Sequence, residues 1–485
     1  MSYSVQGLLD ASILIAGEWQ QATGPAIAVT NSANGETVAE LPSASPEQVQ
    51  AALKAADEAR YGWARTAPSV RAQLVRDMAR VLRESVDELA PLIMWESGKT
   101  QATSAVEVEV SAIMLEVNAE WALRVEGEVL PSDAPTEIIN VLREPLGVVV
   151  AICPWNWPLA TWARKFGPAL TTGNTVIAKP SEVTPLSTVR AMQIITEKLD
   201  VPPGVIGLLT GGGDVGGALS SSPVTNMVTF TGHRDTGKKI MAAAAANLTR
   251  VALELGGKAA AIVLADADID RAVEALIGAR FANAGEMCGC AERILVERPV
   301  YDEFVAKYVT AAGAIEFGDP ERNLMFGPLA NADHLAKVSG AVEKAKSEGA
   351  VARTGGSIPT GGDFDKGGYY YPPTVLTNVT PDMSIAIDET FGPVIPVIPI
   401  DSFEEGLKIA NDTRYGLAGY LYTSSYAKAM VGARDFECGE LFINRTVGEA
   451  LHAHHSGHKE SGIGGEDGKH GILKYTQLKV VYHNW

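Results

Sequence analysis

The chain has 485 residues, of which 46% are hydrophobic and 20% are charged, and its formal net charge is −18 at pH 7. Single hydrophobic cores rarely grow past about 250–300 residues, so this length predicts two sizeable globular domains. An acidic balance disfavours nucleic acid and anionic membranes as partners, because both require clustered Lys and Arg. We therefore expect a small-molecule substrate.

Four cysteines in a chain of this length do not form a disulfide framework, which indicates a reducing, cytoplasmic environment. The N-terminal segment carries Asp10 and Glu18 and lacks a basic stretch before its short apolar run, so it does not resemble a signal peptide. The longest uncharged stretch, residues 146–163, is too short and too interrupted by proline to span a bilayer.

In chain order, the first strong periodicity runs from Ser69 to Lys99, where apolar residues recur at the spacing of one amphipathic helix. A second helix is predicted over residues 105–121. Residues 127–145 hold three prolines among short β-branched runs, a pattern typical of exposed or edge strands. We interpret this segment as an excursion from the main domain.

From Gly147 onward, short apolar runs alternate with helical patterns, and this alternation predicts a parallel, doubly wound sheet. In such sheets ligands bind beyond the carboxyl ends of the strands. The predicted strands are residues 148–152, 175–178, 205–209, 227–230 and 251–255. A second α/β unit is predicted from strand 260–264, helix 268–281, strand 294–296 and helix 300–315.

Cys288 lies in a stretch of glycine and small residues that the pattern places at the start of a helix. A helix N-terminus lowers the pKa of a thiol and so favours the nucleophilic thiolate. Free cysteines are more often buried structural residues, however. The local sequence leaves both interpretations open.

Glu254 ends an apolar run, where a carboxylate is unfavourable unless it has a role. Burial would raise its pKa toward the range of a general base. The alternative is a structural glutamate held in an ion pair.

Pro154 and Pro158 bracket a short loop directly after a predicted strand, and two prolines predict a rigid loop. Asn156, in its centre, would then be a positioned amide donor for an oxyanion. Alternatively, the two flanking tryptophans are core anchors and Asn156 caps the loop.

Two segments that follow predicted strands are interpreted as contacts to a dinucleotide cofactor. They are residues 179–182, which begin with lysine, and residues 232–237, which contain glycine. Neither has the usual dinucleotide fingerprint, and residues 211–216 are only a loose variant of it.

Taken in this order, the segments resemble the aldehyde dehydrogenase superfamily over residues 15–482. Four separate signatures carry the resemblance: residues 179–182, 254–257, 285–293 and 389–394. It implies an α/β fold of two Rossmann-like domains with parallel sheets and a small β oligomerisation element. Residues 1–122 and 146–255 would form the NAD-binding domain, 256–455 the catalytic domain, and 123–145 with 456–485 the oligomerisation element.

The resemblance also implies roles for individual side chains. Cys288 would be the nucleophile, Glu254 the base that hydrolyses the thioester, and Asn156 with the Cys288 backbone N–H the oxyanion hole. Lys179 joins them as a catalytic candidate and, with Glu182, would bind the adenosine ribose. The expected cofactor contacts are Ile152, Pro154, Trp155, Lys179, Ser181, Glu182, Gly211, Gly216, Phe230, Thr231, Gly232, His233, Gly237, Glu254, Leu255, Gly256, Glu389 and Phe391. A carboxylate at Glu182 repels a 2′-phosphate, so NAD is expected rather than NADP.

Within the superfamily, the resemblance is to bacterial lactaldehyde and glycolaldehyde dehydrogenases, on residues 288–293, 367–373, 443–445 and 462–471. It implies a small polar aldehyde, with a semialdehyde or an aromatic aldehyde as the alternative. A hydroxyl or an anionic group would suit the expected substrate contacts, which are Asn156, Trp157, Arg164, Met287, Glu449 and His455.

Several residues depart from the family pattern or have an ambiguous role. Glu286 stands where the family usually has Gln, and it would add a negative charge two residues from the nucleophile. The histidines of residues 452–458 are interpreted as part of a substrate funnel, because no helical pattern and no supporting carboxylate favours a metal. No metal is therefore expected. Cys290 is interpreted as a neighbour without a catalytic role, the alternative being a strained disulfide with Cys288. Glu466 is interpreted as a surface residue, the alternative being a role in proton transfer.

Two other functions are less consistent with these residues. A CoA-acylating relative lacks the general-base glutamate, and a non-catalytic structural relative would not need Cys288, Glu254 and Asn156. The edge-strand segment at residues 127–145 and the β-rich run at 479–482 look like strands that seek a partner subunit. A homodimer or a homotetramer is expected.

Overall fold

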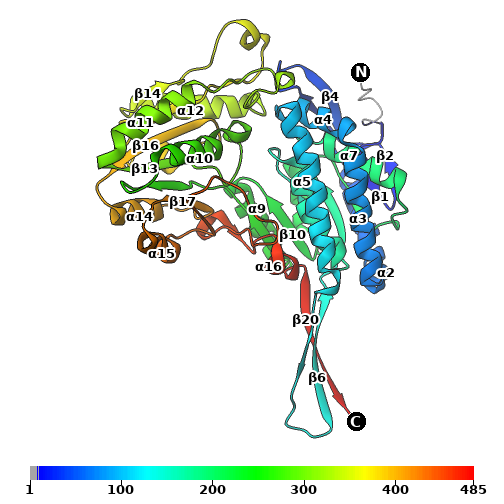
Figure 1. Cartoon of the computed structure of the whole chain (residues 1–485). Helices are drawn as coiled ribbons and strands as arrows, with labels where there is room; N and C mark the ends of the chain where they lie inside the picture. The colour runs from blue at the N-terminus through cyan, green and yellow to red at the C-terminus, as the bar shows by residue number, and fades with distance from the viewer. Residues whose placement is uncertain (1–7, 9) are drawn as a thin grey trace.

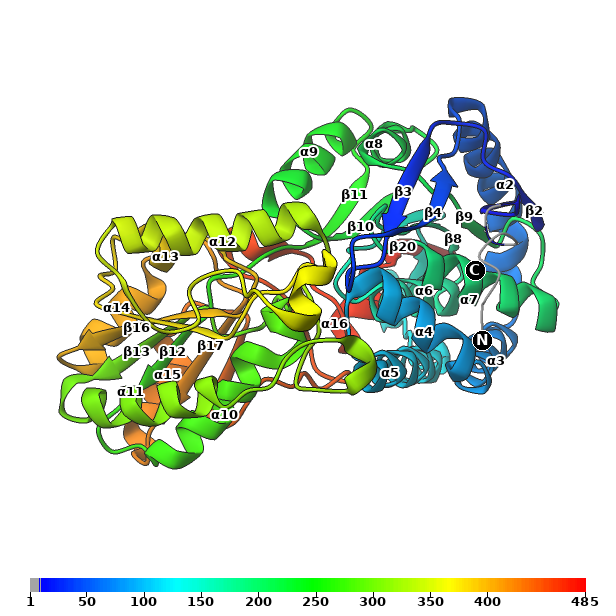
Figure 2. The ribbon, with the colours of Figure 1, turned by 90° about the horizontal axis from the view of Figure 1, so that it is seen from above.

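The computed structural model describes residue 8 and residues 10–485; residues 1–7 and 9, which the sequence analysis includes in the first domain, lie outside the described residues. Two α/β lobes stand side by side, and a long arm of β-strands projects below them (Figure 1). Seen from above, each lobe has its helices packed around its own sheet (Figure 2).

The first lobe is built on an eight-stranded sheet in the order β19-β11-β10-β7-β8-β9-β1-β2. Its strands are β1 (Ile13–Ile15), β2 (Glu18–Gln20), β7 (Val148–Ile152), β8 (Thr175–Lys179), β9 (Ile206–Leu208), β10 (Met227–Thr231), β11 (Arg250–Glu254) and β19 (Gly462–Ile463). Its helices are α2 (Pro46–Arg65), α3 (Pro68–Glu84), α4 (Val86–Ser97), α5 (Gln101–Ala119), α6 (Pro158–Thr171), α7 (Leu186–Lys198), α8 (Gly213–Ser221) and α9 (Arg234–Ala245). A separate ribbon pairs β3 (Ala26–Thr30) with β4 (Thr37–Pro42).

The second lobe is built on a seven-stranded sheet in the order β14-β15-β16-β13-β12-β17-β18. Its strands are β12 (Ala260–Val263), β13 (Arg293–Glu297), β14 (Val351–Thr354), β15 (Thr374–Thr377), β16 (Val394–Ile400), β17 (Ala418–Tyr422) and β18 (Glu440–Ile443). Its helices are α10 (Ile269–Phe281), α11 (Arg298–Gly313), α12 (Ala332–Ser347), α13 (Ser384–Ile387), α14 (Phe403–Asn411) and α15 (Tyr426–Asp435).

The prediction of an α/β fold with two parallel-containing sheets is confirmed. In the first sheet, the central strands β11, β10, β7, β8 and β9 run parallel. In the second sheet, all strands except β14 run parallel, in the spatial order β15, β16, β13, β12, β17 and β18. Strands β7 and β8 are buried along their whole length. Continuous apolar runs are what a parallel strand needs when helices cover both of its faces.

The single helix predicted from Ser69 to Lys99 is wrong. Two helices, α3 and α4, meet at Ser85, whose backbone (φ −115°, ψ 16°) is not helical. Both helices bury apolar residues in the same core, among them Val75, Leu82 and Leu89. The apolar spacing therefore continues across the break, and periodicity alone cannot detect it.

The C-terminal segment is divided between two places. Gly462–Ile463 forms β19 and pairs antiparallel with β11 in the first sheet. Beyond α16 (Gly468–Leu473), β20 (Thr476–Asn484) leaves the lobe and pairs antiparallel with β6 (Glu137–Pro145), which in turn pairs with β5 (Glu128–Leu130). These three strands form the projecting arm (Figure 1). Within residue 8 and residues 10–485, no helix has the length and apolar character needed to cross a membrane.

Candidate active site

The carboxyl ends of four adjacent parallel strands form one edge of the first sheet. In the strand register, Ile152 of β7 lies beside Lys179 of β8 and Phe230 of β10, and Thr231 of β10 lies beside Glu254 of β11. Residues that follow these strands must therefore meet at this edge, where open α/β sheets bind ligands.

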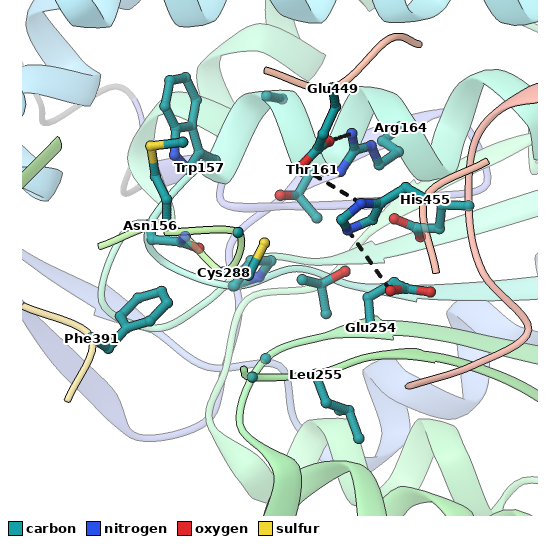
Figure 3. Close-up of a pocket in the computed structure, with 18 of the residues that line it drawn as sticks. Asn156, Trp157, Thr161, Arg164, Glu254, Leu255, Cys288, Phe391, Glu449 and His455 are labelled. Carbon is teal, nitrogen blue, oxygen red and sulfur yellow. Dashed lines mark hydrogen bonds and ion pairs between the residues drawn. The ribbon is translucent and has the colours of Figure 1, made fainter. Parts of the chain in front are cut away.

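A cavity of about 530 Å³ opens at this edge, and the second lobe closes its other side. Figure 3 shows its central side chains. The expected site residues that line it are Pro154, Trp155, Asn156, Trp157, Arg164, Thr231, Gly232, His233, Glu254, Leu255, Gly256, Met287, Cys288, Glu389, Phe391, Glu449 and His455.

Eight expected cofactor contacts do not line this cavity: Ile152, Lys179, Ser181, Glu182, Gly211, Gly216, Phe230 and Gly237. They adjoin it along the same sheet edge. A Cβ on Gly216 would come within 4.0 Å of Ile152 and Lys179, and a Cβ on Gly237 would stand 2.6 Å from Leu255. The glycines therefore leave bare backbone beside the strand ends, where a ligand longer than the cavity could extend.

Cys288 is not at the start of a helix, so that prediction is wrong. It lies in a turn of the loop between α10 and β13, three residues after a short 3₁₀ turn (Ala282–Gly285), and its side chain is free and partly exposed. Asn283 and Ala284 have left-handed backbone (φ 50° and 55°), which ends the helical path. The loop places the thiol in the cavity between the two lobes (Figure 3).

The Asn156 loop is held by a buried ion pair that sequence patterns did not reveal. Lys99 Nζ donates to the backbone carbonyl of Asn156 and lies 3.1 Å from Glu107 Oε2. Glu107 Oε1 accepts the backbone N–H groups of Leu159 (2.9 Å) and Ala160 (3.2 Å) at the start of α6. Loop and helix are thereby fixed together.

The side-chain amide of Asn156 donates one of its two protons in a hydrogen bond to the protein. Its Nδ2 donates to the backbone carbonyl of Glu286, 2.8 Å away. A primary amide carries a second proton, and the residue lines the cavity beside Cys288 (Figure 3). The geometry therefore leaves a positioned N–H donor near the thiol.

Glu254 is a buried carboxylate without a hydrogen-bond donor. Its side chain is 3% exposed, and both of its oxygens lack a hydrogen-bond partner. Burial raises its pKa to about 7, although the nearby His455 opposes this shift. A carboxyl group with that pKa can take up and release a proton at neutral pH.

His455 connects Glu254 to a group of acidic side chains. Its Nε2 lies 3.8 Å from Glu254 Oε2, and its Nδ1 lies 2.8 Å from Glu440 Oε2 and 3.6 Å from Glu449 Oε1. Burial lowers the pKa of His455, but Glu449, Cys288 and Glu440 outweigh burial, so its pKa is well above the ordinary value. Glu440, the first residue of β18, was missed because nothing in its local sequence distinguishes it from a surface glutamate.

Arg164 forms the far wall of the cavity. Its Nη2 lies 2.5 Å from Glu449 Oε2 and 2.9 Å from Asp467 Oδ2. The guanidinium is thus already matched by two carboxylates, and this wall carries no surplus positive charge.

Comparisons with known proteins agree with this geometry. The model of the aldehyde dehydrogenase family matches residues 19–481. The chain belongs to this family. It is 43% identical over 459 residues to the lactaldehyde dehydrogenase of Escherichia coli (strain K12), a match that covers 94% of this chain and 95% of that protein. It is 40% identical over 474 residues to the 3,6-anhydro-alpha-L-galactose dehydrogenase of Vibrio sp. (strain EJY3), covering 97% and 98% of the two chains.

Solved structures show the same relationship. The crystal structure of the Escherichia coli lactaldehyde dehydrogenase superposes with a TM-score of 0.94 at 42% identity, covering 97% of this chain and 98% of that one. The betaine aldehyde dehydrogenase of Staphylococcus aureus in complex with NAD+ superposes with a TM-score of 0.94 at 34% identity, covering 97% and 94%. This chain is therefore an enzyme that oxidises aldehydes, as the sequence predicted.

Two expectations about acidic residues of this aldehyde dehydrogenase are wrong. Glu286 does not add a charge near the thiol at neutral pH, because burial raises its pKa to about 8 and its Oε1 accepts the Ala330 N–H (3.0 Å). In its protonated form Glu286 can replace the Gln that the family usually has. Glu466 is not a surface residue: it is 3% exposed and lies 2.5 Å from the buried Lys165 Nζ.

The four histidines near residue 455 do not form one group. His455 lines the cavity, whereas His452 and His458 are exposed and His454 packs against the ring of His470, with the ring centroids 5.5 Å apart. Cys290, two residues from the thiol of Cys288, is fully buried, and burial raises its pKa to about 12.

Proposed function

We propose that this aldehyde dehydrogenase uses NAD to oxidise a small hydroxylated aldehyde, such as lactaldehyde or glycolaldehyde, to its carboxylic acid. One observation carries the proposal: Cys288, Glu254 and Asn156 face a single cavity whose far wall is Arg164, Glu449 and His455. The wall offers both donors and acceptors to a hydroxyl group.

In the proposed mechanism, the Cys288 thiolate adds to the aldehyde carbon and forms a C–S bond. The resulting oxyanion accepts hydrogen bonds from the Asn156 amide and the Cys288 backbone N–H. A bound nicotinamide supplies the acceptor for the hydride that leaves this carbon. A thioester on Cys288 remains; Glu254 takes a proton from water, the water oxygen attacks the thioester carbon, and the C–S bond breaks to release the acid.

The chain's own residues are compatible with a dinucleotide at the sheet edge. A Cβ on Gly256 would collide with the carboxylate of Glu389, and Glu389 Oε1 accepts the Gly257 N–H (2.8 Å), so bare backbone and an acidic acceptor lie side by side. Glu182 would accept the adenosine ribose hydroxyls, with Lys179 Nζ 3.1 Å from its Oε2. Its negative charge favours a free 2′-hydroxyl, and therefore NAD over NADP.

The proposed substrate carries a hydroxyl and no charge. A semialdehyde would bring a carboxylate, but Arg164 is already paired with Glu449 and Asp467. A hydroxyl can accept from Arg164 or donate to Glu449 without an added charge. The relatives named for lactaldehyde and for 3,6-anhydro-alpha-L-galactose dehydrogenation also have hydroxylated or ether-containing aldehydes in their names.

The test is a comparison of kcat/KM for glycolaldehyde, lactaldehyde, succinic semialdehyde and benzaldehyde with NAD and with NADP. We expect the hydroxylated aldehydes with NAD to exceed the semialdehyde by at least about tenfold, the effect of one uncompensated charge. Cys288→Ala should lose acid formation, whereas the matched change at a thiol outside the cavity, Cys438→Ala, should retain it. A preference for the semialdehyde would contradict the substrate proposal, and turnover by Cys288→Ala would contradict the mechanism.

We also propose the domain division expected from the sequence, in which residues 1–122 and 146–255 bind NAD and residues 256–455 supply the nucleophile. Residues 123–145 would join subunits of a homodimer or homotetramer. Of residues 456–485, which were expected to join them, we keep only β20 (Thr476–Asn484), because Gly462–Ile463 pairs with β11 in the first sheet. Support comes from the arm, where Val129, Leu478 and Tyr482 expose apolar surface that a monomer would leave in water. Cytoplasmic localisation remains a prediction from the free cysteines.

A further inference from the structure

Three side chains in the cavity present different metal-binding atoms to one another. The Cys288 sulfur, a ring nitrogen of His455 and a carboxylate oxygen of Glu449 all lie within 4.8 Å of one another. We propose that these residues form a binding site for Zn²⁺, and that the ion inhibits the enzyme reversibly by occupying its thiol. The binding is independent of the proposed function, whereas the inhibition rests on the role proposed for Cys288.

The donor set suits zinc in type and in spacing. Zinc prefers thiolate, imidazole and carboxylate ligands in a tetrahedron, with metal–ligand distances of about 2.0–2.3 Å, so ligand atoms lie roughly 3.2–3.8 Å apart. A closure of about 1 Å brings the three atoms to that spacing. Cys288 and Glu449 are partly exposed at the cavity wall, so small rotations of these two side chains toward the buried His455 can supply it. Hard cations such as Mg²⁺ prefer oxygen ligands alone, so the thiol selects against them.

The imidazole is already oriented as it is in zinc sites. Nδ1 of His455 lies 2.8 Å from Glu440 Oε2, and this carboxylate fixes the ring, so Nε2 can bind a metal once it has given up its proton. Such carboxylate–histidine pairs commonly support zinc ligands. Local sequence does not reveal this carboxylate, because Glu440 precedes His455 by 15 residues and belongs to another element.

A second, independent observation points to a ligand at this place. Glu254 is 3% exposed, and neither of its oxygens has a hydrogen-bond partner, although Oε2 lies 3.8 Å from His455 Nε2. A buried carboxylate without a donor is unfavourable unless something binds it. In the proposed hydrolysis, the Glu254 carboxylate would hold the attacking water molecule. With zinc present, the same carboxylate can bind the ion directly, or bind a water molecule that is the ion's fourth ligand.

The local charge also favours a cation. Carboxylates of Glu254, Glu440 and Glu449 surround His455, and Arg164 is shared between Glu449 and Asp467. When Zn²⁺ binds, the Cys288 thiol and the His455 ring each give up any proton they hold to the solvent, and a Zn–S and a Zn–N bond form. No electron is transferred, so a chelator reverses the reaction.

The decisive experiment uses Co²⁺ as a spectroscopic probe on the full-length protein after treatment with a chelator. Thiolate coordination produces a sulfur-to-cobalt charge-transfer band in the near ultraviolet, and tetrahedral geometry produces intense visible bands. We expect one Co²⁺ per chain with both features. Cys288→Ser should lose the charge-transfer band, and His455→Asn and Glu449→Gln should each weaken Co²⁺ binding by at least about tenfold, the cost of removing a ligand.

The matched control is His452→Asn, because His452 is exposed and lies three residues from His455 in the same loop. It should bind Co²⁺ like the parent protein. Circular dichroism of each variant separates loss of the site from loss of the fold. The site would be overturned if the parent protein showed no charge-transfer band or if the band persisted in Cys288→Ser. It would also be overturned if Co²⁺ binding were unchanged in both His455→Asn and Glu449→Gln.

The inhibition has its own test. Zn²⁺ should inhibit aldehyde oxidation competitively with the aldehyde, excess chelator should restore the rate, and bound Zn²⁺ should protect Cys288 from alkylation by iodoacetamide. Co²⁺ binding without any aldehyde oxidation by the parent protein would support the metal site and contradict the proposed function. Aldehyde oxidation that Zn²⁺ does not affect would overturn the inhibition.

Discussion

Lys99 and Glu107 form an ion pair in which neither side chain has any exposed surface, with Nζ 3.1 Å from Oε2. Lys99 binds the carbonyl of Asn156, and Glu107 binds two N–H groups at the start of α6. A glutamate there also matches the positive end of the helix dipole. The pair thus connects helix α5 to the loop that holds a proposed catalytic amide.

We expect Glu107→Gln to destabilise the protein by about 3–5 kcal/mol, because it leaves the buried Lys99 charge without a partner. Urea unfolding measures the change. The matched control is Glu58→Gln, which removes an exposed pair with Lys54 (N···O 3.8 Å) and should cost less than about 1 kcal/mol. Equal effects for the two variants would mean that the buried pair does not hold the fold together.

Replacement of Glu254 by Gln should separate the two halves of the reaction. The first turnover does not need the base, so stopped-flow NADH formation should show a burst close to that of the parent. The steady state should slow by roughly 100-fold or more, the usual contribution of a general base. A burst that slows as much as the steady state would assign Glu254 to the first step instead.

The pH dependence of deacylation should follow the Glu254 carboxyl group. Burial raises its pKa to about 7, and only the ionised form can take a proton from water. Below pH 7 the rate should therefore fall about tenfold per pH unit, and above it the rate should reach a plateau. Steady-state rates in buffer with a chelator test this; in Glu254→Gln the dependence should vanish. A rate that rises as the pH falls through 7 has the wrong sign for this base.

Cofactor preference should depend on Glu182, whose side chain is 44% exposed at the end of the site. Glu182→Thr removes the charge that would repel a 2′-phosphate, so kcat/KM with NADP should rise relative to NAD by about tenfold. The control, Glu126→Thr, removes an exposed carboxylate from outside the cavity and should leave the ratio unchanged. If Glu182→Thr left the NADP-to-NAD ratio of kcat/KM unchanged, Glu182 would not be the residue that selects the cofactor.

Subunit association should depend on the apolar face of the arm. Leu478 and Val480, on β20, are 57% and 47% exposed. The double change to Asp should give a monomer by light scattering, because two charges in a buried interface are costly. Lys479→Gln, between them, should leave the oligomer intact. If the parent protein were already a monomer by light scattering, the proposed homodimer or homotetramer would be contradicted.

Local sequence was enough to predict the strands that build the site. The run from Val148 to Ile152 was predicted with the bounds that the structure has, because a strand buried on both faces must be continuously apolar. The polar residues that follow these runs were predicted to meet, because parallel strands bring their carboxyl ends to one edge. Glu254 and Asn156 were candidates for this reason, and the family resemblance assigned roles to both of them and to Cys288 before any distance was known.

Tertiary structure alone decided the environment of those groups. The sequence could not show that Glu254 faces His455, because β19 brings a segment about 200 residues later in the chain beside β11. For the same reason it missed Glu440 and Lys99, and it assigned Glu466 to the surface. Periodicity and turn chemistry act over a few residues, whereas burial, ion pairing and the pKa of a carboxyl group depend on whatever the fold packs against it. The sequence determined which groups can react, and the fold decided the charge and the partner of each one.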